Sequence, residues 1–121
     1  MRYLVIAQPT GATPNVPPQQ FAQMLDTVVV PSVDMLATWE REGRIHGGSF
    51  VGRRGGCFII DAASNEELAG LLMTLPFWGL QDWTITPLTS DEAAAKRFRE
   101  LSQRLKSTGQ RVEQLSSRAA E

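Results

Sequence analysis

Four short runs of β-forming residues are separated by stretches in which apolar positions recur at helical spacing. Strands are predicted at Arg2–Ala7, Arg44–Val51, Cys57–Asp61 and Trp83–Thr86. Helical apolar stripes comprise Phe21, Met24, Leu25, Val28 and Val29 in one stretch, and Leu68, Leu71, Leu72 and Leu75 in another. The predicted order of elements is therefore β-α-β-β-α-β.

Turn and cap residues set the limits of these elements. The segment Gly52–Gly56 supplies the positive φ angles that a hairpin loop of about five residues needs. Ser64 and Glu67 have the spacing of a capping box at the start of the second helix. In the first helix, Pro31 predicts a kink or a restart, and Gly43 predicts a left-handed cap at its end.

The element order indicates the α+β class and a ferredoxin-like fold, in which two helices cover one face of a four-stranded antiparallel sheet. In the third predicted strand, Cys57 and Ile59 point to one side, and Phe58 and Ile60 point to the other. Both faces are thus largely apolar, although two helices cover only one. We therefore expect a homodimer that packs sheet to sheet.

The chain beyond Pro87 predicts a separate element. We expect a ferredoxin-like domain at residues 1–89 and an amphipathic helix at residues 90–121. A heptad seam is formed at spacings of four and three by Ala94, Phe98, Leu101, Leu105, Thr108, Val112, Leu115 and Ala119. The helix could lie over its own domain or fray beyond Gly109. Its narrow stripe and the strong charge on its other faces favour pairing between subunits, which would build a higher oligomer.

Charge and composition exclude several classes of partner. The 12 basic and 13 acidic residues give a net charge of −1, so we expect no nucleic-acid partner. The apolar runs are too short to span a bilayer and no signal sequence is apparent, so we expect a cytoplasmic protein without a membrane partner. Cys57 predicts a buried, inert thiol. One histidine and one cysteine form no ligand cluster, so we expect no metal.

The candidate acid/base residues are His46 and Glu40. His46 is the only histidine, and imidazole is a natural general base for a proton α to a carbonyl. Arg44 shares its parity, so both side chains could face one pocket, where the guanidinium would hold a substrate carboxylate. Glu40 is the second candidate if its carboxylate turns inward beside Trp39. The plainer alternatives are a surface or structural histidine and solvated charges at a helix end.

Other residues are candidates for binding a small molecule. Tyr3 could polarise a carbonyl, or it could simply pack with its hydroxyl satisfied. Arg53 and Arg54 could be exposed turn charges, or they could form a cationic rim that recruits an anionic substrate. Trp39, which flanks the first apolar stripe, could border the same pocket.

Several motifs together resemble the muconolactone isomerase family over about residues 1–90. They are a helix ending in Arg-Glu-Gly at Gly43, a Phe-Ile-Ile-Asp strand ending at Asp61, the cap sequence Ser-Asn-Glu-Glu-Leu from Ser64, and a Leu-Pro-Phe helix end at Phe77. The resemblance implies a dimeric α/β barrel built from ferredoxin-like subunits. It also implies a cofactor-free enzyme of aromatic catabolism that isomerises muconolactone to an enol-lactone by proton transfer.

The second strand departs from the family pattern. It reads Arg-Ile-His-Gly-Gly-Ser-Phe from Arg44, whereas the family enzyme carries basic and aromatic residues there. We therefore expect an isomerase-like protein acting on a small anionic lactone or enolisable acid. The alternatives are a non-catalytic small-ligand-binding protein and an oligomeric assembly module of the same fold.

Overall fold

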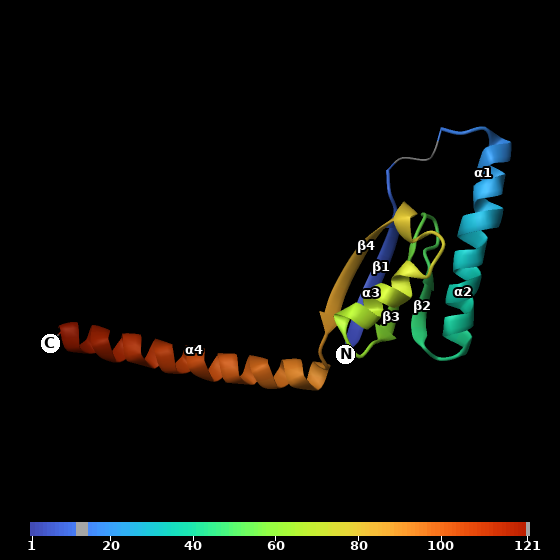
Figure 1. The fold of residues 1–121 in the computed structure, drawn as a ribbon. Coiled ribbons are helices and arrows are strands. Elements are labelled where there is room, and N and C mark those ends of the chain that lie inside the picture. The colour runs from blue at the N-terminus through green and yellow to red at the C-terminus, as the bar shows by residue number, and fades with distance from the viewer. Residues whose placement is uncertain (12–14, 121) are drawn as a thin grey trace. The chain divides into compact units, whose positions relative to one another are not determined.

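The computed structural model describes residues 1–11 and 15–120, with side chains as far as residue 117. Two compact units are formed, Met1–Leu88 and Thr89–Glu121. The elements are β1 (Arg2–Pro9), α1 (Pro18–Met24), a π-helical turn (Leu25–Val29), α2 (Val30–Arg41), β2 (Ile45–Ser49), β3 (Gly56–Asp61), α3 (Asn65–Met73), a 3-10 turn (Trp78–Leu80), β4 (Gln81–Leu88) and α4 (Asp91–Ala120). The predicted β-α-β-β-α-β order is confirmed (Figure 1).

The four strands form one sheet in the order β2-β3-β1-β4, and every neighbouring pair is antiparallel. This arrangement confirms the predicted α+β, ferredoxin-like class. Side chains of β1 and β3 pack on one face against those of α2, α3 and the following segment; this core contains Tyr3, Val5, Trp39, Ile45, Phe58, Ile60, Ala62, Leu68, Leu72, Leu75 and Phe77. Among the described residues, no helix is long and apolar enough to cross a membrane.

The segment α1, the π-helical turn and α2 form one continuous rod (Figure 1). Pro31 is the second residue of α2, which follows the π-helical turn without a break. The next residue, Ser32, is fully buried. Its hydroxyl donates to the Val28 carbonyl at 2.7 Å and accepts from the Phe77 N–H at 2.9 Å. The Ser32 hydroxyl therefore links the first turn of α2 to the segment that follows α3.

The predicted caps and turns are confirmed. The Ser64 hydroxyl accepts from the Glu67 N–H at 3.1 Å, and the Glu67 carboxylate accepts from the Ala63 N–H at 2.6 Å. In the β2–β3 hairpin, Gly55 has a φ of 107°. A Cβ at Gly55 would also collide with the Ala7 carbonyl oxygen. Both constraints require glycine at this position.

Two expectations about local structure need correction. The second strand covers Ile45–Ser49 and is shorter than predicted, because its flanking residues enter turns. Cys57 is half-buried rather than buried, because its side of the sheet carries no helix of Met1–Leu88. The helix α4 runs from Asp91 to Ala120 and includes Gly109.

Candidate functional site

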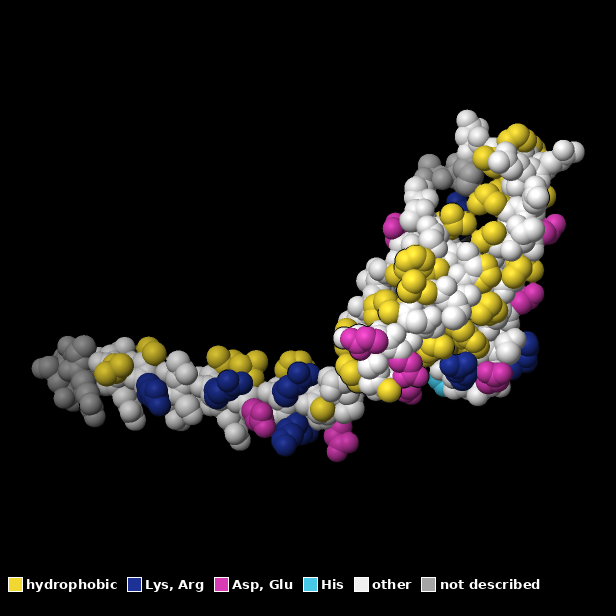
Figure 2. Space-filling view, in the orientation of Figure 1, with side chains coloured by type: hydrophobic (Ala, Val, Ile, Leu, Met, Phe, Trp, Pro, Cys, Tyr) yellow, Lys and Arg dark blue, Asp and Glu magenta, His cyan; other side chains and the backbone are white. Residues whose placement is uncertain are grey.

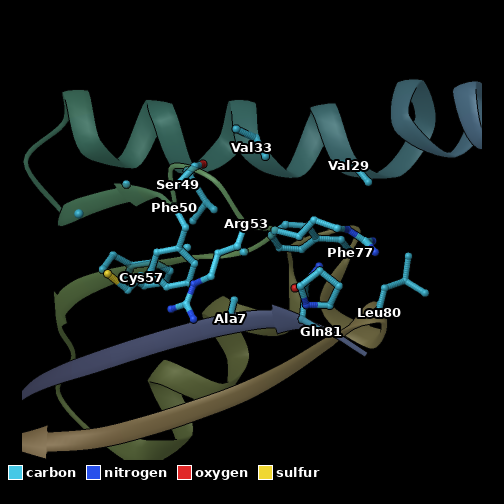
Figure 3. A pocket seen from close by; sticks show the side chains of 18 of the residues that line it. Ala7, Val29, Val33, Ser49, Phe50, Arg53, Cys57, Phe77, Leu80 and Gln81 are labelled. Atoms are coloured by element: carbon cyan, nitrogen blue, oxygen red, sulfur yellow. The ribbon is translucent and has the colours of Figure 1, made fainter. Parts of the chain in front are cut away.

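A cavity of about 540 Å³ lies between the sheet and the rod formed by α1 and α2 (Figure 3). Most of its wall is apolar, as is usual for small-molecule sites. The rod contributes Phe21, Met24, Leu25, Val29, Val33, Leu36 and Ala37, and the opposite wall includes Ala7, Ile45, Phe58, Phe77, Leu80 and Trp83. The cavity therefore favours a ligand with a largely apolar body.

The π-helical turn shapes one wall of this cavity. Its first and last residues, Leu25 and Val29, both line the cavity. A π-helical turn changes the direction of the side chains that follow it, and such turns are frequent at functional sites. In this chain the turn lies immediately before Pro31, so the irregular backbone and the cavity wall occupy the same stretch of the rod.

Glycines form the wall on the β2–β3 side. Gly47, Gly48, Gly55 and Gly56 all line the cavity. A Cβ at Gly47 would collide with the Cys57 carbonyl oxygen, and a Cβ at Gly56 would lie 2.7 Å from the Gly48 carbonyl oxygen. These positions cannot carry side chains without moving backbone. The glycines thus keep β2 and β3 close together and leave the cavity open beside them.

A few polar groups border the apolar walls. Glu40 near the end of α2 and Arg53 and Arg54 in the β2–β3 hairpin all line the cavity. The Arg53 guanidinium carbon lies 4.1 Å from the centroid of the Phe50 ring, which holds the charge beside an aromatic wall (Figure 3). The side chains of Glu40, Arg53 and Arg54 are all exposed, so they lie at the edge of the cavity.

Of the residues predicted from sequence, Glu40, Arg53 and Arg54 line the cavity, whereas His46 does not. The register pairs His46 with Ile59, and pairs Gly47 with the core residue Phe58. The imidazole is therefore exposed on the sheet face opposite the core. The structure does not bring His46 and Glu40 together.

The three remaining candidates lie outside the cavity wall. The guanidinium carbon of Arg44 lies 5.5 Å from the Trp39 ring centroid, and the indole itself is buried in the core. Because Arg44 precedes β2, the strand parity that predicted a shared pocket with His46 does not apply to it. The Tyr3 hydroxyl is directed to Asn65, donating to its Oδ1 at 2.6 Å. No group of three or more His, Cys, Asp or Glu side chains suited to a metal occurs among the described residues.

Sequence reasoning missed several wall residues. Ser49 and Gln81 contribute polar groups to the cavity, and Phe50 contributes an aromatic ring. Strand alternation from the buried Ile45 places Gly47 and Ser49 on the core side, so that signal could have identified Ser49. Nothing in the local sequence marks Gln81, which reaches the cavity only because β4 begins there, paired with Pro9.

Two solved structures have a fold similar to that of this chain. The chain is similar to a crystal structure of muconolactone isomerase, with a TM-score of 0.58 and 21% identity over 74% of this chain and 90% of that chain. It is also similar to 5-chloro-2-hydroxyhydroquinone dehydrochlorinase from Burkholderia phenoliruptrix in complex with 2,5-dihydroxybenzoquinone, with a TM-score of 0.50 and 19% identity over 74% and 94% of the two chains. At these identities the likeness shows the fold. No curated protein sequence matches the chain.

The sequence comparison extends over most of the chain. The family model described as muconolactone delta-isomerase matches residues 1–94, which include every element of the ferredoxin-like unit and the beginning of α4. The chain therefore belongs to the muconolactone delta-isomerase family.

Proposed function

We propose that this protein isomerises a small anionic unsaturated lactone, or a related enolisable acid, by proton transfer without a cofactor. The observation that carries the proposal is the cavity in which Glu40, Arg53 and Arg54 border apolar walls. Membership of the muconolactone delta-isomerase family supports the reaction type. A place in the catabolism of aromatic compounds follows from the same proposal.

Glu40 is the proposed acid/base group. Its carboxylate would remove a proton from a carbon next to the carbon–carbon double bond of the substrate, and the electron pair would delocalise onto the carbonyl oxygen. Return of the same proton to the other end of the conjugated system would shift the double bond and regenerate the carboxylate. The proton that is removed in the first step is returned in the second, so the product is an isomer of the substrate. One carboxylate can carry out both steps. General acid/base catalysis of this kind contributes about 10²–10⁴-fold to rate.

The two arginines are the proposed anchors for the substrate carboxylate, because a guanidinium binds a carboxylate through paired hydrogen bonds. The Ser49 hydroxyl also lines the cavity and would donate to the carbonyl oxygen that gains charge during the reaction.

A homodimer packed sheet to sheet belongs to the same proposal. On the face opposite the core, Leu4, Ile6, Cys57 and Ile59 are only half-buried. A second copy would bury these apolar side chains, and a symmetric pair does so with one self-complementary surface. His46 lies on this face, so it would contribute to the interface rather than to the cavity of its own chain.

Proton exchange followed by NMR tests the proposed reaction. The protein is mixed in heavy water with muconolactone and a panel of related lactones and keto acids. Protein-dependent deuterium uptake or isomerisation is expected for at least one compound, and Glu40→Gln should abolish it. Glu42→Gln is the matched control, because Glu42 lies two residues away and does not line the cavity.

Two results would contradict the proposed reaction. Absence of exchange across the panel by folded protein would remove the proposed activity for these substrate classes. A compound that raises the melting temperature without being changed would instead support a ligand-binding protein of the same fold. Retention of full exchange by Glu40→Gln would contradict the role given to that carboxylate.

A further inference from the structure

The helix α4 carries an apolar seam that nothing within its own unit covers. At heptad positions a and d, the described seam consists of Ala94, Phe98, Leu101, Leu105, Thr108, Val112 and Leu115. Phe98, Leu105 and Leu115 are 68%, 63% and 64% exposed. Figure 2 shows hydrophobic side chains gathered along one side of this helix. A 30-residue helix that exposes such a stripe gains most of its stability only by packing it.

The two flanks of this seam differ. One flank is an arginine column at heptad position g, formed by Arg97, Arg104 and Arg111. The other flank is a small-residue column at position e, formed by Ala95, Ser102, Gly109 and Ser116. The sequence continues the arginine column at Arg118, whose side chain lies outside the described residues. A partner helix must therefore place compatible residues beside the arginine column on one side and beside the small-residue column on the other.

We propose that α4 forms a parallel, in-register, two-stranded coiled coil with α4 of a second copy of this chain. In a parallel pair, position g of one helix lies beside position e of the following heptad on the other helix. Arg104 would then lie beside Gly109 of the partner subunit, and Arg97 would lie beside Ser102 of the partner subunit. The small column leaves room for the arginine stems to cover the seam while their charged ends stay in water.

An antiparallel pair would bring the wrong flanks together. It sets g against g and e against e, so Arg104 would face Arg111 of the partner subunit. Every flank contact on the basic side would then join like charges, which is destabilising. Packing within the seam would also be less favourable. In that register position a pairs with position d, so the apolar Leu105 would lie against the polar Thr108 of the partner subunit. The distribution of charge therefore selects the parallel arrangement.

Residues within the seam favour the same arrangement. Val112 at position a with Leu101 and Leu115 at position d is the combination typical of two parallel strands. Thr108 at position d meets its own counterpart only in a parallel, in-register pair, where the two hydroxyls can hydrogen-bond to each other. Asp91 and Glu92 in the first turn offset the positive helix ends that a parallel pair brings together.

Single cysteines in the full chain test the orientation. Cys57→Ser provides the background, and Leu115→Cys and Leu101→Cys each introduce one thiol at position d. In a glutathione redox buffer, both variants should form disulfide-linked homodimers at equilibrium. Gln110→Cys is the matched control, because position f lies on the outer side of the helix. We expect at least a tenfold higher disulfide population at either d position than at position 110.

Mixing Phe98→Cys chains with Leu115→Cys chains separates the two orientations. In the antiparallel register these positions face each other, so a predominant mixed disulfide would overturn the proposal. A parallel pair should give the two homodimers in excess over the mixed species. Equal disulfide populations at positions 101, 110 and 115 would overturn pairing altogether. Circular dichroism confirms that each variant keeps its helix content, so loss of folding is not mistaken for loss of pairing.

Discussion

The two faces of the sheet are built from alternate residues of the same strands, yet they differ in what covers them. On one face Val5 and Ile60 are buried beneath the helices, and the cavity opens at the end of this layer. On the other face Ile6 and Ile59 are half-buried, and His46 is exposed. Ala7 and Phe58 of the covered face line the cavity, whereas His46 on the other face does not.

The charged residues at the cavity are not strand residues. Glu40 comes from the last turn of α2, and Arg53 and Arg54 come from the loop between β2 and β3. Elements buried on a common core leave little room for charge, whereas their ends and connections can carry it at the edge of the cavity. The three charged residues that line the cavity thus lie at a helix end and in a loop, while the strands contribute side chains to the buried core.

The largest effect is expected from removing the cavity carboxylate. Glu40→Gln keeps the size of the side chain but cannot accept a proton, so kcat should fall about 10²–10⁴-fold. His46→Gln changes the opposite face and should leave kcat within about twofold, because the imidazole does not line the cavity. Steady-state kinetics on the substrate identified by proton exchange measures both values.

The reverse ranking would overturn this assignment of roles. If His46→Gln lost activity and Glu40→Gln kept it, the reaction would take place on the uncovered face of the sheet. Measurement of oligomer mass for both variants is the control, because His46 lies on the face proposed to pair with a second copy.

Neighbouring isoleucines provide a stability test of the same comparison. Ile60 is 2% exposed in the core, so Ile60→Ala should lower the free energy of unfolding by about 2–5 kcal/mol. Ile59 is half-buried on the other face, and Ile59→Ala should cost only about 1 kcal/mol in the monomer. Urea unfolding at several protein concentrations measures both substitutions.

Protein concentration distinguishes a free face from a paired one. If the sheet pairs with a second copy, the cost of Ile59→Ala should grow as protein concentration rises, whereas the cost of Ile60→Ala should not. Equal costs for the two variants at low concentration would mean that the uncovered face is packed within the single chain, and the comparison of the two faces would fail.

Local signals were sufficient to predict the fold. Glycines with positive φ, the Ser64 capping box and the helical stripes each reflect short-range geometry, and all were found in the structure. The π-helical turn was not predicted, because the sequence before Pro31 shows only that the helix cannot continue unchanged. The hydrogen bonds of this π-helical turn join residues five apart, and they depend on how the rod of α1 and α2 packs against the rest of the domain.

The site was only partly predictable, because the periodicity of a strand shows which residues share a face but not which face the helices cover. His46 was assigned to a pocket from its chemistry and from the parity it shares with Arg44, but the register with Ile59 places it on the other face of the sheet. Arg44 was expected to face the same pocket, but it lies before β2 and its guanidinium stacks on Trp39. Glu40 and Arg53 line the cavity, and their charge at a helix end and in a glycine-rich loop is visible in the sequence.

The hairpin arginines should affect binding more than turnover. Arg53→Gln removes one charged anchor, which is worth about 1.5–3 kcal/mol. KM should therefore rise roughly 10–100-fold while kcat changes little. Arg44→Gln is the matched control, because its guanidinium stacks on Trp39 outside the cavity wall. An unchanged KM in Arg53→Gln, or an equal rise in Arg44→Gln, would contradict an anion site at the hairpin.

A further stability effect concerns the buried Ser32 hydroxyl, which accepts a hydrogen bond from the Phe77 N–H of the cavity wall. Ser32→Ala leaves the Phe77 N–H without its partner in a buried site, which should cost about 1–3 kcal/mol in urea unfolding. Thr27→Ala is the matched control, because its exposed hydroxyl also bonds a carbonyl four residues earlier, at 2.7 Å to Gln23. That control should change stability by less than about 0.5 kcal/mol. Equal losses in the two variants would show that the hydroxyl acts only within the helix, whereas a loss confined to Ser32→Ala would show that the rod and the Phe77 wall are held together through it.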